Sequence, residues 1–215
     1  MWKFIADSDE EWQLLLSTNK RLERKHDMYT LKQLEMIVNA CDRCPLAETR
    51  NRAVFGEGNE RSRIMFVGEG PGRHEDQTGK PFVGRAGELL DKMLCAIGLT
   101  RQEIYITNIV KCRPPNNRNP LESECKVCIE YLRWQVKIIE PDIIVCLGAV
   151  AAKNIIDKDF KITLSRGLWY QKGGFEILAT YHPAALLRDP AKKQDAWKDL
   201  KLLRDKYQQV IDICQ

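Results

Sequence analysis

The sequence predicts an α/β protein: a three-layer αβα sandwich around a central, mainly parallel four-stranded sheet, with helices added at the N-terminus. Two observations support this prediction. Short apolar runs recur at residues 64–67, 104–110, 143–147 and 175–180, and nearly continuous apolar runs are typical of strands buried on both faces of a parallel sheet. Segments with apolar residues at helical spacing separate the runs, and such alternation favours a layered α/β fold.

Two helices are expected ahead of the first strand. Residues 8–11 (Ser-Asp-Glu-Glu) and residues 30–33 (Thr-Leu-Lys-Gln) both form capping-box patterns that precede apolar side chains at helical spacing. We therefore expect residues 1–40 to be an N-terminal helical extension and residues 41–215 to form the main domain.

Four more helices are expected between and after the strands. The segment 86–97 has helical spacing of its apolar residues and ends at Gly98, a typical helix stop. An asparagine and a proline precede the helix expected over 121–139, where they supply the cap and first turn. The last two helices are expected over 149–156 and from Ala191 onward.

Composition sets only broad limits. A chain of 215 residues with 44% hydrophobic residues can bury an ordinary core. The net charge of +4, with charges of both signs making up 30% of the chain, permits nucleic-acid binding without indicating it. The N-terminus lacks a signal-peptide pattern, and no apolar run reaches the roughly 20 residues of a membrane helix. We expect a cytoplasmic, monomeric protein with no membrane partner.

Unusual residues stand at the ends of three of the expected strands. They are a glycine-rich, acid-bearing loop (68–76, continued at 81–87), the segment 107–115, which contains Asn108, and the segment 181–188, which contains His182. The carboxyl ends of parallel strands meet at one edge of a sheet, where α/β proteins bind ligands. Taken singly, the glycine-rich loop could equally hold a phosphate. Taken together, the three segments predict one shared pocket.

The eight cysteines predict a metal site, because clustered thiols in a reducing compartment bind metal more often than they form disulfides. Cys41 and Cys44 form one C-x-x-C pair, Cys125 and Cys128 form another, and Cys112 follows a strand. Residues three apart share a helix face, so spacing alone allows either member of the second pair as a ligand. Zinc and an iron–sulfur cluster both remain open at this point. Cys95 and Cys146 are interpreted as small core residues.

Four motifs carry a close resemblance to a known family. They are Gly-Glu-Gly-Pro-Gly-x-x-Glu-Asp (68–76), Gly-Lys-Pro-Phe-Val-Gly-Arg-Ala-Gly (79–87), Thr-Asn-Ile-Val-Lys-Cys-Arg-Pro-Pro (107–115) and His-Pro-Ala-Ala-Leu-Leu-Arg (182–188). In this order they resemble the iron–sulfur uracil-DNA glycosylases, family 4 of the uracil-DNA glycosylase superfamily. The resemblance implies a DNA repair hydrolase that flips uracil out of single- or double-stranded DNA and cleaves its N-glycosidic bond, the first step of base excision repair.

The resemblance also implies roles for residues around the base. Phe82 would stack on the flipped uracil, Asn108 would read its O4 and N3–H, and the backbone around Glu69 and Gly70 would bind the other carbonyl. His182 would stabilise the developing charge on O2. Gly70 stands where some relatives carry an aspartate that positions water, so the nearby acids Glu69 and Glu75 are the remaining candidates. Glu75 could orient water or exclude the methyl group of thymine, and Asp76 is expected to make a hydrogen bond that structures the loop.

Further roles concern DNA and the cofactor. Leu186 stands where the superfamily inserts a wedge into the base stack, and Arg188 and Arg113 are expected to contact phosphates, together with Lys111 and Arg118. The resemblance assigns a [4Fe–4S] cluster to four thiolates and leaves Cys125 as an extra thiol. These four ligands are Cys41, Cys44, Cys112 and Cys128.

Three alternatives compete with this interpretation. A non-catalytic iron–sulfur protein, either DNA-bound or electron-transferring, would fit the cysteines but would leave Phe82, Asn108 and His182 without a role. A zinc-dependent nucleotide hydrolase requires Cys125 as a ligand. A branch of the superfamily that traps DNA covalently has a histidine where this chain has Cys112.

Overall fold

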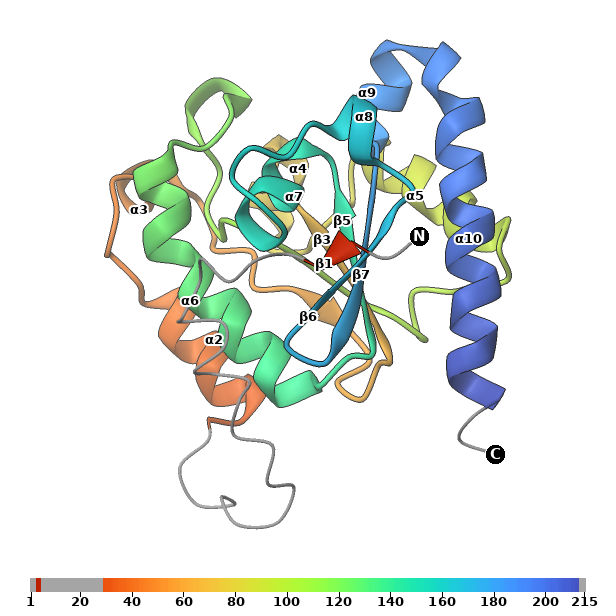
Figure 1. Cartoon of the computed structure of the whole chain (residues 1–215). Coiled ribbons are helices and arrows are strands. Elements are labelled where there is room, and N and C mark those ends of the chain that lie inside the picture. Colours follow the sequence, from red (N-terminus) through yellow and green to blue (C-terminus); the bar gives the residue numbers. More distant parts are fainter. Residues whose placement is uncertain (1–2, 5–28, 213–215) are drawn as a thin grey trace.

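The computed structural model describes residues 3–4 and 29–212 and is an α/β sandwich (Figure 1). Its sheet contains seven strands in the order β1-β6-β7-β5-β3-β4-β2. The strands are β1 (Lys3–Phe4), β2 (Glu57–Gly58), β3 (Ile64–Gly68), β4 (Tyr105–Asn108), β5 (Ile143–Leu147), β6 (Trp169–Lys172) and β7 (Phe175–Thr180).

The four strands expected from the sequence are the four central neighbours β7, β5, β3 and β4, and all of them are parallel. The prediction of a four-stranded sheet is too small, because three further strands extend it at its two sides. β2 pairs antiparallel with β4, β6 pairs antiparallel with β7, and β1 pairs with β6. β1 and β2 have two residues each, and β6 is partly exposed, so none of the three has the continuous apolar run of a central strand.

The helices occupy both faces of the sheet. They are α2 (Leu31–Asn39), α3 (Leu46–Thr49), α4 (Arg73–Thr78), α5 (Arg85–Cys95), α6 (Glu122–Ile139), α7 (Ala149–Ile155), α8 (Ile162–Ser165), α9 (Pro183–Arg188) and α10 (Lys193–Asp212), with short 3₁₀ turns η1 (Pro115–Asn117) and η2 (Pro190–Lys192). The four helices expected after the first strand are confirmed within two residues at each end. The short helices α4 and α9 lie inside the motifs that the sequence presented as loops.

Alternation along the central strands separates two cores. In β3, Met65 and Val67 pack with residues of α2, α6 and α7, whereas Ile64 and Phe66 pack with residues of α5, α9 and α10. Figure 1 shows α2 and α6 on one side of the sheet and α10 on the other. The three-layer arrangement predicted from the strand and helix pattern is therefore confirmed.

The second of the two expected N-terminal helices is α2, and the first lies outside the described residues. The side chain of Thr30 caps α2 by accepting a hydrogen bond from the N–H of Gln33, and the Gln33 side chain accepts from the N–H of Thr30, as the capping box predicts. Leu31, Leu34 and Val38 are buried in the same core as α6. Within the described ranges, no helix is long and apolar enough to cross a membrane.

Candidate functional site

The three motifs meet at the carboxyl edge of the central strands. Gly68 ends β3 and Asn108 ends β4, and the two residues are paired in the parallel register. The pairing continues past the strand ends, because the N–H of Ile109 donates to the Gly68 carbonyl at 3.0 Å. His182 follows β7 and is the cap of α9. We call Gly68, Phe82, Asn108 and His182 the strand-end site.

The Asn108 side chain is buried with an unused acceptor. The residue is 1% exposed, and its Oδ1 has no hydrogen-bond partner among the described residues. Buried polar atoms are nearly always paired, because an unmet one costs about 1–3 kcal/mol. A buried amide oxygen without a donor therefore indicates a ligand that supplies one.

Gly68 creates the room beside this amide. A Cβ at this position would lie 2.4 Å from Asn108 Oδ1 and 2.6 Å from Cζ of Phe82. Both distances are far below van der Waals contact, so any side chain here would displace the asparagine or the aromatic ring. Glycine thus lets Asn108 and Phe82 approach the same point from two elements.

The ring of Phe82 is held by a strained and heavily supported loop. Its φ of 52° lies in the left-handed region, which is unfavourable for a bulky side chain. Oε1 of Glu75 accepts hydrogen bonds from the N–H groups of Val83 and Gly84, both at 2.9 Å, and Arg101 donates to the Phe82 carbonyl. Gly87 leaves space for that carbonyl, since a Cβ there would lie 1.7 Å from it. These contacts fix the orientation of the Phe82 ring.

His182 is held as a neutral imidazole. Its Nδ1 accepts a hydrogen bond from the N–H of Ala184 at 3.1 Å, so in the neutral ring the proton is on Nε2. Burial, followed by the positive charge of Arg188, lowers the pKa of His182 to about 4. The imidazole stacks against Phe82, with ring centroids 5.5 Å apart. The site therefore presents a neutral N–H donor beside an aromatic face.

The two acids of the glycine-rich motif occupy different surroundings. Glu69 is half-buried, and burial raises the pKa of its carboxyl group while the charge of Arg188 lowers it. Both oxygens of Glu75 are already bonded to backbone, because Oε2 accepts from the N–H of Gly72 at 3.1 Å and Oε1 accepts from the Phe82 loop. A Cβ at Gly70 would lie 2.6 Å from Val110 Cγ2, so an aspartate would not fit there without displacing Val110.

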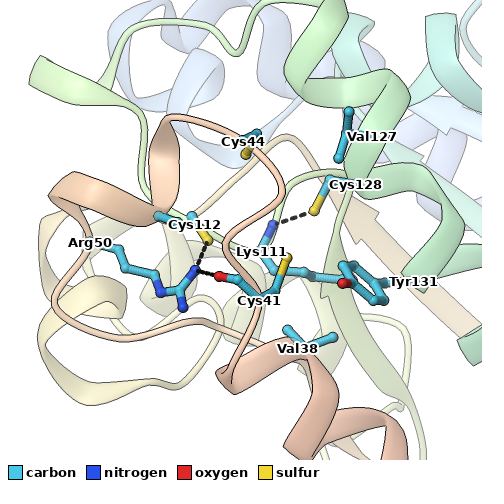
Figure 2. A pocket seen from close by; sticks show the side chains of 10 residues that line it. Val38, Cys41, Cys44, Arg50, Lys111, Cys112, Val127, Cys128 and Tyr131 are labelled. Carbon is cyan, nitrogen blue, oxygen red and sulfur yellow. Dashed lines mark hydrogen bonds between the residues drawn. The ribbon is translucent and has the colours of Figure 1, made fainter.

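Four cysteines line a second site, a pocket on the α2–α6 side (Figure 2). Cys41 and Cys44 follow α2 and are half-buried, Cys112 follows β4, and Cys128 lies on α6. The side chain of Arg50 donates to the sulfur of Cys112 at 3.2 Å, and a backbone N–H donates to the sulfur of Cys128 at 3.3 Å. Hydrogen-bond donors aimed at sulfur are typical of thiolates that serve as metal ligands.

Cys125 does not line this pocket. It is buried one helical turn before Cys128, and its side chain is hydrogen-bonded to Asn154 of α7. Within residues 3–4 and 29–212, no group of three or more His, Cys, Asp or Glu side chains is arranged to hold a single metal ion. Cys146 is a core residue as expected, but the expectation for Cys95 is wrong, because its side chain is exposed.

Comparison with known proteins settles the family. The model of the uracil DNA glycosylase superfamily matches residues 55–201, which include the complete strand-end site. The chain belongs to this superfamily. A type-4 uracil-DNA glycosylase of Thermotoga maritima is 49% identical over 170 residues, covering 75% of this chain and 88% of the relative. One of Archaeoglobus fulgidus is 44% identical over 183 residues, or 81% of this chain and 92% of the relative.

Another branch of the superfamily is more distant. A type-5 uracil-DNA glycosylase of Pyrobaculum aerophilum is 31% identical over 146 residues, covering 60% of this chain and 64% of the relative. The greater identity and coverage of the type-4 relatives agree with the four motifs that carried the family resemblance.

The residues that were expected to contact DNA are only partly exposed. Leu186, expected as the wedge, is 2% exposed and packs in the α5–α9–α10 core, whereas the next residue, Leu187, is 37% exposed. The helical turn of α9 explains the difference, because neighbouring residues on a helix point about 100° apart. Arg188 is exposed, as a phosphate contact requires.

The basic residues after β4 differ in the exposure and in the hydrogen-bond partners of their side chains. Arg113 is half-buried and donates to Asn117 Oδ1 at 2.7 Å. Arg118 makes two hydrogen bonds to Glu124, at 2.6 and 2.9 Å. The expectation that Lys111 contacts phosphate is wrong, because its side chain is 1% exposed.

Sequence reasoning missed three supporting residues. Gly68 was visible inside the glycine-rich motif, but its steric role depends on two distant side chains. Arg50 and Arg101 carried no signal, since an isolated arginine in a polar stretch does not show which carbonyl or sulfur it will meet.

Proposed function

We infer that this chain is a monofunctional uracil-DNA glycosylase, a hydrolase that removes uracil from DNA and leaves an abasic site. The observation that carries this inference is the unpaired, buried Oδ1 of Asn108 beside the Phe82 ring and the neutral His182 donor. A base inside a duplex cannot reach these groups, so the nucleotide must be flipped into the strand-end site.

Asn108 would supply the base selectivity. Its carbonyl Oδ1 accepts the N3–H of uracil while its amide donates to O4. Cytosine presents an unprotonated N3 and an amino group at these positions. Its N3 acceptor would then meet the carbonyl oxygen of Asn108, and its amino donor would meet the amide N–H. One unmet buried hydrogen bond costs about 1–3 kcal/mol, which corresponds to about 5- to 150-fold in binding. Phe82 contributes stacking, which accepts either pyrimidine.

His182 and the motif acids would serve the chemical step. As the N-glycosidic bond breaks, negative charge develops on the uracil, and the Nε2–H of His182 would donate to O2 and stabilise the leaving anion. Glu69 would orient the attacking water, since its carboxylate makes no hydrogen bond among the described residues. Glu75 would act as a positioning residue, because its carboxylate accepts two hydrogen bonds from the loop that carries Phe82.

We also propose that the four-cysteine pocket holds a [4Fe–4S] cluster through Cys41, Cys44, Cys112 and Cys128. The fit rests on four converging thiols with hydrogen-bond donors on two sulfurs. A [4Fe–4S] cluster is held by four cysteine thiolates, and these four cysteines of the pocket would supply them. When bound, the cluster would supply a covalent cross-link that joins the end of α2, the loop after β4 and α6.

The remaining assignments concern partners. The substrate would be uracil in single- or double-stranded DNA, with Arg188 and Arg113 on phosphates. Leu187 is the better placed of the two leucines for the emptied base stack, and Leu186 could serve only if α9 moved. We propose that the chain acts as a monomer, with residues 1–40 as an extension, in the reducing cytoplasm where free thiols persist.

Uracil excision from oligonucleotides tests the function. The purified protein is incubated with single- and double-stranded DNA that contains one uracil, and alkali then cleaves each abasic site. Strand breaks are expected with the unaltered protein and should be strongly reduced in Asn108→Ala and His182→Ala. If the unaltered protein made no more breaks than these variants, the chain would be a non-catalytic iron–sulfur protein. Iron analysis and a broad visible absorbance test the cluster, and a colourless protein with stoichiometric zinc would refute it.

A further inference from the structure

A largely buried ion pair joins α10 to the residues that follow α8. The carboxylate of Asp199, on α10, is 1% exposed and accepts two hydrogen bonds from the Arg166 guanidinium, from Nε at 2.8 Å and from Nη2 at 2.5 Å. Arg166 directly follows α8, and its side chain is 15% exposed. Gly167 leaves room for the carboxylate, because a Cβ there would lie 2.4 Å from Asp199 Oδ1. The pair is therefore closely enclosed by the fold.

This ion pair contacts both residues that precede His182. Oδ2 of Asp199 accepts a hydrogen bond from the Thr180 hydroxyl at 2.6 Å. The Arg166 guanidinium lies over the ring of Tyr181, 5.6 Å from its centroid, within the range at which a cation is attracted to an aromatic face. Thr180 and Tyr181 are both buried. One ion pair thus holds the two residues through which the chain passes from β7 to His182.

The position of the His182 ring depends on these residues. β7 ends at Thr180, which is paired with Leu147 and whose carbonyl accepts a hydrogen bond from the N–H of Gly148 at 2.8 Å. His182 lies two residues beyond this end. It packs closely on Gly148, because a Cβ there would lie 3.0 Å from the Cβ of His182. A displacement of Thr180 would therefore move the imidazole relative to the Phe82 ring against which it stacks.

The geometry of the pair favours positioning over simple packing. Apolar side chains of similar volume often stabilise a fold as well as a buried ion pair does, because burial removes the hydration of both charges. Apolar contact has no preferred direction. Here Nε and Nη2 of one guanidinium bind the two oxygens of one carboxylate, and this bidentate arrangement fixes orientation as well as distance.

We propose that Asp199 is a positioning residue for His182. Through its ion pair with Arg166 and its hydrogen bond to Thr180, it fixes the end of β7 and so the direction of the imidazole Nε2–H. The inference rests on the proposed glycosylase function, in which that N–H would stabilise the departing uracil, and deepens it. It extends the machinery of the strand-end site to a buried residue of α10 that would touch neither the base nor the DNA.

The test separates loss of positioning from loss of stability. Asp199→Asn removes the charge that pairs with Arg166. Thr180→Val removes the hydroxyl with little change of shape, whereas Thr180→Ser keeps it. Asp142→Asn is the control of the same chemistry, because Asp142 pairs with Arg63 at 2.7 Å where β5 begins, at the edge of the sheet opposite to the strand-end site.

Two measurements are made on each variant. Uracil excision is measured in single turnover with saturating enzyme, in the normal, His182→Ala and Asn108→Ala backgrounds. The chain has three histidines, so nuclear magnetic resonance of protein labelled with ¹⁵N-histidine reports directly on the His182 ring. Its signals are identified by their loss in His182→Ala. This second measurement requires no enzymatic activity.

Asp199→Asn and Thr180→Val are expected to excise uracil about 10- to 100-fold more slowly, because misplacement by about 1 Å has effects of this size. Thr180→Ser and Asp142→Asn should excise it at nearly the unaltered rate. In the His182→Ala background the further fall should nearly vanish, since Asp199 acts through that ring, and in the Asn108→Ala background it should persist. The His182 ring signals should shift in Asp199→Asn and Thr180→Val but not in Asp142→Asn.

Three results would overturn the inference. They are a normal excision rate in Asp199→Asn and Thr180→Val, an equal fall with and without His182, and His182 signals that these substitutions do not move. If Asp199→Asn does not fold, Thr180→Val and Thr180→Ser decide, and equal excision by these two variants refutes the role of the hydroxyl. Absence of uracil excision by the unaltered protein would instead refute the proposed function, and the histidine signals would still test the positioning.

Discussion

Replacing Asn108 by alanine should destroy activity without weakening the fold. The Asn108 Oδ1 is buried and unpaired in the free protein, so its removal recovers about 1–3 kcal/mol of desolvation free energy. Loss of the packing of the amide offsets about 1 kcal/mol of this gain. The free energy of unfolding should therefore be unchanged or higher by up to about 2 kcal/mol. For a chain of this size that corresponds to a melting temperature raised by up to about 8 °C.

The same substitution removes the groups that would read uracil. We expect the single-turnover excision rate to fall about 10²- to 10³-fold, as it does when one transition-state hydrogen-bond donor is removed from an active site. Thermal unfolding followed by circular dichroism and the alkali-cleavage assay on the same preparation measure the two effects together.

The neighbouring Thr107 provides the matched control. Its Oγ1 donates to the Phe55 carbonyl at 2.9 Å and accepts from Lys111, so it is buried and fully paired. Thr107→Val should therefore lower the melting temperature, whereas Asn108→Ala should not. If Asn108→Ala lost several degrees of melting temperature and kept its excision rate, Asn108 would be a structural residue and the argument from its unpaired oxygen would be refuted.

Three further predictions follow from the site geometry. Cys128→Ser should abolish iron binding and visible absorbance while Cys125→Ser retains both, and equal loss in the two variants would exclude our ligand assignment. Gly68→Ala should fold but lose excision, because its Cβ would lie 2.4 Å from Asn108 Oδ1; normal uracil turnover by this variant would contradict the steric argument. Because the pKa of His182 is lowered from 6.5 to about 4, its neutral form contributes stability that is complete above pH 6.5 and is lost as pH falls through 4. Protonation of His182 should accordingly not lower the excision rate near the ordinary histidine pKa of about 6.5, and a fall centred there would show that the surroundings of the imidazole do not lower its pKa. Any fall at lower pH would be shared with Glu69, because burial raises the pKa of its carboxyl group.

Much of the fold could be predicted because the central strands are locally distinctive. A run such as 143–147 has no polar residue to place on a solvent face, and this identifies a strand covered on both sides. The edge strands could not be predicted, since β1 and β2 are two residues long and exist only through pairing with distant partners. The helix caps of α2 were predictable, because a capping box is a contact between residues three apart.

The strand-end site shows the same division. Asn108 and His182 were found because they follow strands in motifs of unusual composition. Which leucine of α9 faces outward was not predictable, because the rotation of a short helix is set by the core against which it packs. The burial of Lys111 reverses the usual expectation for a lysine, and only the oxygens contributed by β4 and α6 account for it.

The class of fold, the edge of the sheet that carries the unusual residues, the candidate cysteines and the family resemblance could all be read from residue types and short spacings. Which side chains meet depends on how the chain folds. The tertiary structure separated Cys128 from Cys125, bonded both oxygens of Glu75 to backbone, left the Asn108 oxygen unpaired and buried the Lys111 side chain among oxygens of β4 and α6. These facts depend on distances between segments far apart in the chain, which local residue patterns do not encode.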